Sequence, residues 1–154
     1  MGDIKYDRKL AIKTTGIKEW DDDNIYYNRC EPTPYKALVQ LFKHYKLAKT
    51  DRLVDFGSGK GRVAFYIHHR FQIPVLGIEA QEDVINQARQ NKSRYMEKLK
   101  SKDLPIHFEH AYAEYYQVKP EDNKFFFFNP FSADVFQEVL LNITDSLKST
   151  NRQV

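Results

Sequence analysis

The chain has 154 residues, 42% of them hydrophobic, and no Gly-, Ser- or Pro-rich stretch long enough to be a linker, so it has room for one compact domain. Its formal charge of +3 is spread along the sequence and offset by 21 acidic residues, unlike the basic stripe of a dedicated nucleic-acid-binding protein. The single cysteine excludes an internal disulfide, and no apolar run is long enough for a signal peptide or a membrane span. These features predict a cytoplasmic protein without a membrane partner.

The first 30 residues are polar with scattered aromatic side chains and the acidic cluster Asp21–Asp23, and they show neither helical nor strand periodicity. We therefore expect an N-terminal arm or lid over residues 1–32, not a core element, followed by the main domain over 33–154. The density of proline and polar residues in the segment 28–35 suits a rigid lid. Glu31 and Thr33 are candidate pocket contacts, although a helix cap at Thr33 and a first-turn acid at Glu31 are the simpler explanations.

A helix is predicted at about residues 34–47. Thr33 supplies a capping hydroxyl, Pro34 stands where its missing N–H costs nothing, and apolar residues recur at helical spacing from Leu38 to Tyr45.

Beyond this helix, short apolar runs alternate with helical patterns. Strands are predicted at 53–56, 75–79, 106–109 and 124–128, and helices over about 62–70, 82–99 and 133–147. This alternation is typical of an α/β fold, a Rossmann-like parallel sheet with helices on both faces. The basic end of the third of these helices, residues 92–102, fits a solvated helix terminus better than a binding patch.

The first strand leads into a glycine loop, residues 57–61, with the spacing G-x-G-x-G. Glycines let the backbone approach a bulky nucleoside-containing ligand, and the next helix offers free N–H groups. The spacing does not fit a mononucleotide phosphate loop, which would need a Gly at Val54 and a Ser or Thr at Gly61. It does not fit a dinucleotide loop either, because Arg62 occupies the third glycine position.

Glu79 ends the second strand, eighteen residues beyond Gly61. The crevice outside the carboxyl ends of neighbouring parallel strands would hold a ribose there, and a carboxylate accepts both ribose hydroxyls. The alternative is an exposed acid at a strand end, which the spacing to the loop disfavours.

Residues 53–61 resemble motif I of the class I S-adenosylmethionine-dependent methyltransferases, and residues 77–79 resemble the second-strand motif of the same family. The resemblance covers about residues 33–148. It implies S-adenosylmethionine as cofactor, with its ribose on Glu79 and its methionine part on the first strand and loop: Asp55, Gly57, Ser58, Gly59 and Gly61. In this family the adenine lies beside the loop after the third strand, which here contains Ala113 and Glu114.

Asn129, Pro130 and Phe131, directly after the fourth strand, are similar to the Asn-Pro-Pro-aromatic motif of methyltransferases that modify planar or amide nitrogens, with one proline in place of two. There, polar groups of the motif hold the acceptor amine and a ring stacks on the substrate, so catalysis is mainly alignment. The resemblance implies catalytic roles for these three residues. An equally supported alternative is that Asn129 and Pro130 only end a strand and start a helix.

The resembled fold has seven strands in the order 3-2-1-4-5-7-6, whereas only four strand signals occur here. Residues 125–128 are apolar on both faces, as in a central strand that something must cover. We expect a fold lacking its last strands, with the fourth-strand edge covered in a longer chain, by a second copy in a homodimer, or by residues 145–154 folding back. Truncation or dimerisation is favoured.

Two functions remain. The first is an S-adenosylmethionine-dependent methyltransferase acting on a nitrogen, either a protein amine or a nucleobase amine; a resemblance of the glycine-loop strand to the non-SET histone-lysine methyltransferases makes a protein lysine one candidate. The second is a non-catalytic S-adenosylmethionine-binding or interaction domain with an incomplete acceptor site. A nicotinamide-dependent oxidoreductase is disfavoured by Arg62. No metal is expected, because neighbouring helix positions such as His68 and His69 do not converge on one ion.

Overall fold

The computed structural model describes residues 2–20 and 24–154, so the acidic cluster Asp21–Asp23 lies outside the described residues. The strands are β1 (Leu53–Phe56), β2 (Val75–Glu79), β3 (Ile106–His110) and β4 (Lys124–Phe127). The α-helices are α1 (Asp3–Leu10), α2 (Tyr35–His44), α3 (Arg62–Phe71), α4 (Glu82–Leu99) and α5 (Ala133–Ser149), and a short 3-10 helix, η1, spans Ala113–Tyr115. The predicted bounds of the strands at 53–56 and 75–79 and of the helix at 82–99 are confirmed.

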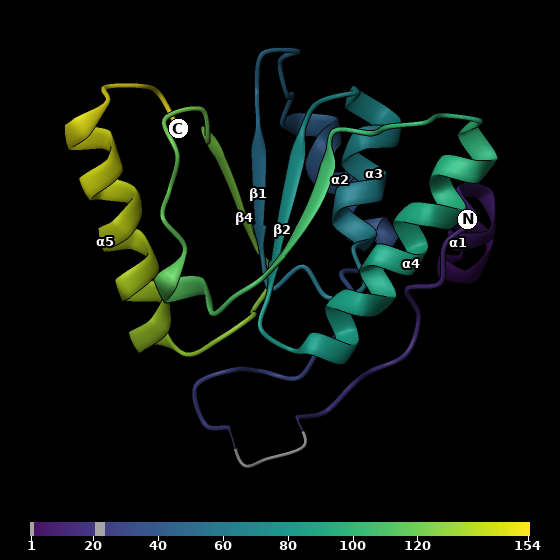
Figure 1. Cartoon of the computed structure of the whole chain (residues 1–154), viewed down its shortest axis with the longest axis horizontal. Coiled ribbons are helices and arrows are strands. Elements are labelled where there is room, and N and C mark those ends of the chain that lie inside the picture. Colours follow the sequence, from purple (N-terminus) through teal and green to yellow (C-terminus); the bar gives the residue numbers. More distant parts are fainter. Residues whose placement is uncertain (1, 21–23) are drawn as a thin grey trace.

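The four strands form one parallel sheet in the order β3-β2-β1-β4. Leu53 of β1 lies opposite Val75 of β2 and opposite Lys124 of β4, so the carboxyl ends of the strands meet at one edge of the sheet. Figure 1 shows α2, α3 and α4 on one side of this sheet and α5 on the other. The predicted Rossmann-like α/β fold is confirmed, and its strand order agrees with the start of the expected order.

Alternate residues of the strands supply two separate cores. On one face Leu53, Val75 and Ile106 pack against α2, α3 and α4. On the other face the neighbouring strand residues pack against α5 and the segment around η1. Burial on both faces explains why β1 and β2 are nearly continuous apolar runs, whereas the edge strand β3 carries exposed polar residues.

β4 has apolar side chains on both faces, as predicted, because Phe126 packs on one core and Phe125 and Phe127 on the other. It nevertheless lies at the sheet edge, and within residues 2–20 and 24–154 only β1 pairs with it. The chain end does not fold back along the strand. Instead, Arg152 donates to the carbonyls of Lys119 and Asp122, before β4 begins. Cover by a second copy or a longer chain stays a prediction.

The expectation that the N-terminal 30 residues contribute nothing to the core is wrong for residues 3–14. Leu10 and Ile12 are buried in the core formed with α2 and α3. Next to them, Asp7 accepts hydrogen bonds from the Thr14 hydroxyl (2.8 Å) and the Tyr35 hydroxyl (2.8 Å). Because α1 buries polar groups as well as apolar ones, its sequence lacks the hydrophobic period that identifies a helix.

Arg62, at the start of α3, ties this segment to the domain. Its side chain is buried and donates to Asp3, to the Thr14 hydroxyl (2.7 Å) and to the carbonyl of Thr33 (3.1 Å). The predicted capping role of Thr33 is also wrong, since α2 begins at Tyr35 and its first N–H donates to Asp3 (3.3 Å).

Within the part of the chain that the structure describes, none of the helices has both the length and the apolar character needed to cross a membrane.

Candidate cofactor and acceptor site

The glycine loop connects the end of β1 to α3 at the edge where the strands terminate. Gly57 and Gly59 both have positive φ values, +76° and +55°, and the N–H groups of Gly57 and Ser58 donate to the carbonyl of Ile78 at 2.9 Å. A Cβ on Gly57 would overlap the ring of Pro130. Glycine is therefore required at position 57 both by backbone conformation and by the close approach of the loop after β4.

Glu79 is fixed at the end of β2 by the backbone on either side of it. One carboxylate oxygen accepts from the N–H of Gly59 (2.9 Å) and the other from the N–H of Gln81 (2.9 Å). Burial raises the pKa of this carboxyl, and these two N–H groups oppose the rise. Each oxygen keeps a second acceptor position, so the carboxylate is held in place yet still able to accept from two hydroxyls of a ligand.

Asp55 and Ser58 place unpartnered oxygen atoms at the same edge. Asp55 is 2% exposed, and its Oδ2 atom and the Ser58 hydroxyl are buried without hydrogen-bond partners. Burial, and secondarily the carboxylate of Glu79, raise the pKa of Asp55 to about 8. Unpaired buried polar groups are costly, so a cationic or donor group of a ligand would fit here.

Residues 18–20 and 24–33 of the N-terminal segment lie across this edge (Figure 1), and we call these two stretches the strap. Lys18 and Cys30 exchange two backbone hydrogen bonds, at 3.0 and 2.8 Å. The Tyr27 hydroxyl donates to Glu114 and accepts from the N–H of Ala113 (2.8 Å). The strap is thereby anchored to the loop after β3, the segment expected beside the adenine.

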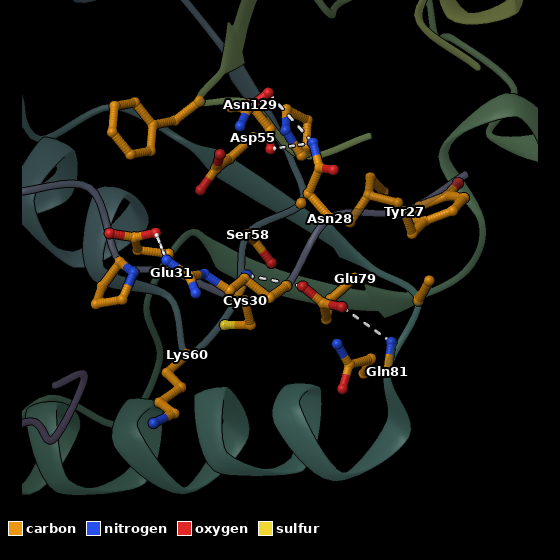
Figure 2. A pocket seen from close by; sticks show the side chains of 18 of the residues that line it. Tyr27, Asn28, Cys30, Glu31, Asp55, Ser58, Lys60, Glu79, Gln81 and Asn129 are labelled. Carbon is orange, nitrogen blue, oxygen red and sulfur yellow. Dashed lines mark hydrogen bonds and ion pairs between the residues drawn. The ribbon is translucent and has the colours of Figure 1, made fainter. Parts of the chain in front are cut away.

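A second anchor joins the strap to the loop after β4. The Asn28 side-chain amide donates to the carbonyl (3.0 Å) and the side-chain oxygen (3.2 Å) of Asn129, and the Asn28 N–H donates to the carbonyl of Pro130 (3.0 Å). Asn129 itself has a φ of +48°, in the left-handed region that Asn tolerates. Figure 2 shows Asn28, Asn129 and Asp55 gathered at one end of the site, with Glu79 and Gln81 at the other.

Together these segments enclose a cavity of about 730 Å³. Most of the predicted site residues line it: Asp55, Gly57, Ser58, Gly59, Glu79, Ala113, Asn129 and Pro130, as well as Glu31 and Thr33. Gly61, Glu114 and Phe131 do not. The cavity is large enough for a nucleoside-sized ligand beside a small acceptor group.

The three predicted residues outside the cavity have structural positions. Gly61 allows α3 to approach β3, since a Cβ there would lie 2.6 Å from the Phe108 ring. Phe131 is 6% exposed, with its ring against Tyr27 and Phe127, so it cannot stack on a substrate. The aromatic residue of this loop that lines the cavity is Phe128, which is 44% exposed.

Sequence reasoning missed several lining residues, among them Tyr27, Asn28, Cys30, Lys60 and Gln81. The strap residues precede the recognisable motifs and carry no spacing of their own. Burial and the nearby Glu79 carboxylate raise the pKa of the Cys30 thiol to about 11, which keeps it protonated and unreactive near neutral pH. Across the described ranges, no cluster of three or more His, Cys, Asp or Glu side chains is arranged to hold a metal ion.

Several solved structures of methyltransferases are similar to the chain. An RNA methyltransferase from Salinibacter ruber is 27% identical over 53% of this chain and 50% of its own, with a TM-score of 0.43. An S-adenosylmethionine-dependent methyltransferase from Thiobacillus denitrificans is 21% identical over 55% of this chain and 32% of its own, with a TM-score of 0.45. For geranyl diphosphate C-methyltransferase from Streptomyces coelicolor A3(2) the identity is 19%, the coverage 59% and 34%, and the TM-score 0.48.

The chain thus spans half the length of the first of these proteins and about a third of the other two. None of the curated proteins compared with the chain matches it. Residues 34–126, more than half of the chain, match the model of a methyltransferase domain. This segment contains the glycine loop, Glu79 and the loop after β3. The chain belongs to this methyltransferase domain family.

Proposed function

We propose that the chain binds S-adenosylmethionine in the cavity at the strand ends and transfers its methyl group to a nitrogen atom of a protein or nucleic acid. The observation that carries the proposal is the pair of buried, unpartnered oxygens on Asp55 and Ser58, set beside the fixed carboxylate of Glu79.

These groups match the polar ends of the cofactor. The unpartnered Oδ2 atom of Asp55 suits the ammonium of the methionine part, and the second acceptor positions of Glu79 suit the two ribose hydroxyls. The glycines at 57 and 59 let the loop lie close to Pro130 and to Cys30, which line the same cavity. The adenine would then lie toward Ala113, which is held by Tyr27.

When bound, the cofactor supplies an activated methyl group on a sulfonium. The chain supplies alignment: the loop after β4, at the Asp55 end of the cavity, presents Asn129 and Pro130 to an acceptor nitrogen. In this arrangement the side-chain oxygen of Asn129 accepts from the acceptor amine, and Phe128 is the ring available for contact with a planar substrate.

Calorimetric titration with S-adenosylhomocysteine, compared with reduced nicotinamide dinucleotide, tests the cofactor assignment. We expect binding of the first at one site per chain and none of the second, and the reverse result would overturn the proposal. Transfer is measured with methyl-labelled S-adenosylmethionine on a lysine-rich peptide and on an RNA oligonucleotide. Asn129→Ala should abolish labelling without changing S-adenosylhomocysteine affinity.

A second function, cofactor binding without turnover, is favoured by one feature of the acceptor end. Asn28 already donates to the side-chain oxygen of Asn129, and Phe131 is buried away from the cavity. Binding of S-adenosylhomocysteine without labelling of either acceptor would support this second function over the first.

A further inference from the structure

The structure gathers basic residues that the sequence spreads out. Residues 3–14 and 86–102 contain ten of the 24 lysines and arginines of the chain but only three of its 21 acidic residues. The ten cations are Lys5, Arg8, Lys9, Lys13, Arg89, Lys92, Arg94, Lys98, Lys100 and Lys102. We call the surface formed by these two segments the basic face.

Asn91 joins the two segments of the basic face. Its side chain is fully buried, accepts from the Lys13 N–H (2.9 Å), and donates to the carbonyls of Lys13 (3.0 Å) and Lys60 (3.0 Å). Arg94 also donates to the Asn91 side chain, at 3.0 Å. The backbone N–H of Lys13 and the guanidinium of Arg94 therefore share one acceptor oxygen, although 81 positions separate the two residues in the sequence.

His69 of α3 marks a second meeting point. Burial lowers the pKa of this imidazole first, and the charges of Lys9 and Lys98, one from each segment, lower it further. The basic face thus continues from Lys13 and Arg94 to the far end of α4.

Little negative charge offsets these cations. Asp3 is paired with the buried Arg62 and Asp7 is buried with Thr14 and Tyr35, so Glu97 is the one exposed acid of the two segments that forms no ion pair with a described residue. None of the ten cations forms an ion pair with a described residue. Elsewhere on the chain Arg29, Arg52 and Lys148 are all paired.

We propose that the basic face binds the phosphate backbone of a nucleic acid. Phosphates pair with unpaired lysines and with the planar fork of arginine, and such contacts supply most sequence-independent affinity for nucleic acids. Along α4, Arg94 and Lys98 are four residues and about 6 Å apart on one side of the helix, which suits neighbouring phosphates of one strand.

The chemistry of the basic face favours nucleic acid over a lipid surface. A membrane-binding helix presents an apolar face beside its cations. Here the exposed large apolar residues of the two segments are single ones at opposite ends, Ile4 and Leu99.

The basic face also reaches the cofactor cavity. Thr14 and Lys60, which line the cavity, adjoin Lys13 through the Asn91 hydrogen bonds. The basic face and the cavity are thus joined through Asn91, and this continuity favours a nucleobase amine as the acceptor class. This last assignment rests on the proposed function; phosphate binding by the basic face does not.

Fluorescence anisotropy with a labelled 24-nucleotide RNA and its DNA counterpart, over a series of salt concentrations, tests the proposal. The triple variant Lys9→Glu/Lys13→Glu/Lys98→Glu should lose at least tenfold in affinity, and its log–log salt slope should fall by about 2. The matched control, Lys43→Glu/Lys46→Glu/Lys119→Glu, changes the net charge equally at exposed positions outside the basic face and should bind like the unaltered chain.

Thermal melts establish that both variants fold, and titration with S-adenosylhomocysteine follows the cofactor site separately. Equal loss of nucleic-acid affinity in both triple variants, or no salt-dependent binding by the unaltered chain, would overturn the proposal. So would binding to phosphatidylserine vesicles in place of either oligonucleotide. Failure to bind S-adenosylhomocysteine overturns the proposed function alone and leaves phosphate binding standing.

Discussion

The two ends of the cavity are built differently. At the cofactor end, Glu79 is held by two backbone N–H groups, and the Asp55 and Ser58 oxygens are buried and unpartnered. At the acceptor end, Asn129 is exposed, and its side chain is already paired with Asn28 from the strap. At the cofactor end, the Oδ2 atom of Asp55 and the Ser58 hydroxyl have no hydrogen-bond partner among the described residues and would need one from a ligand. At the acceptor end, the side-chain oxygen of Asn129 already has a partner in Asn28. The contacts proposed for the cofactor therefore lie on β1, the glycine loop and β2, whereas those proposed for an acceptor lie on the loop after β4, next to the strap.

The largest change in cofactor affinity is expected from substitution of Glu79. Glu79→Ala removes two charge-assisted hydrogen bonds that fix the loop as well as the predicted ribose contacts, each worth about 1.5–3 kcal/mol. S-adenosylhomocysteine affinity should fall at least about 100-fold, measured by calorimetry. Glu79→Gln, which keeps one acceptor oxygen, should lose about tenfold. If Glu79→Ala binds S-adenosylhomocysteine within threefold of the unaltered chain, Glu79 does not hold the cofactor and the proposed contrast between the two ends is wrong.

Asp55 should make cofactor binding depend on pH. Its pKa of about 8 means that the carboxyl is mostly protonated at pH 6 in the free protein, whereas pairing with an ammonium requires the ionised form. S-adenosylhomocysteine affinity should therefore fall about tenfold for each pH unit below 8. Asp55→Asn should bind weakly with no such dependence between pH 6 and 8. An equally steep pH dependence in Asp55→Asn would assign the effect to another group.

The same carboxyl should affect stability in the opposite sense. Because burial raises the pKa of Asp55 in the folded state above its ordinary value, its protonated form is favoured by folding. The ligand-free protein should lose stability as the pH rises from about 4 through about 8. Thermal melts of Asp55→Asn should show a smaller loss over this range, and parallel curves for the two proteins would contradict this.

Gly57 is the point at which the glycine loop contacts the loop after β4. Gly57→Ala should lower the free energy of unfolding by about 2 kcal/mol or more, since an L-residue at this positive φ is strained and its Cβ overlaps Pro130. Chemical denaturation measures the change. Gly2→Ala is the control, because a Cβ there meets nothing within 4 Å. Similar unfolding midpoints for the two variants would show that the glycine loop and the loop after β4 can move apart without a loss of stability.

The smallest effect is expected at Asn28. Asn28→Ala removes two partly exposed hydrogen bonds to Asn129, so unfolding should become easier by about 1 kcal/mol while S-adenosylhomocysteine affinity stays within about twofold. Asn151→Ala, at an exposed position near the C-terminus, is the control and should change neither. A large loss of S-adenosylhomocysteine affinity in Asn28→Ala would show that the acceptor end also contributes to cofactor binding.

Prediction from sequence worked where signals are local. The strands at 53–56 and 75–79 and the glycine loop follow from apolar runs and turn chemistry within a few residues. Helix α1 could not be found this way, because its buried Asp7 is satisfied by Thr14 and Tyr35 through tertiary contacts. Local periodicity carries no information about such partners.

The same distinction between local signals and long-range contacts applies to the candidate site. Glu79 could be assigned from its spacing to the loop and does line the cavity. Phe131, the predicted aromatic contact, does not line the cavity: Tyr27 of the strap pairs with it, and its ring packs in the core. Asn28 lies 101 positions from Asn129, and no sequence spacing indicates that contact.

The strap has a kinetic consequence as well. Tyr27 is paired with residues 86 or more positions later, and Asn28 with one 101 positions later. Closing such long loops is entropically costly, and contacts of this separation slow folding. During synthesis the strap emerges before the sheet, gains its first anchor only with the loop after β3, and lacks its second anchor until the loop after β4 has left the ribosome. We therefore expect the sheet to fold before the cavity gains its strap, so that a refolding chain passes through a species with an open cofactor edge.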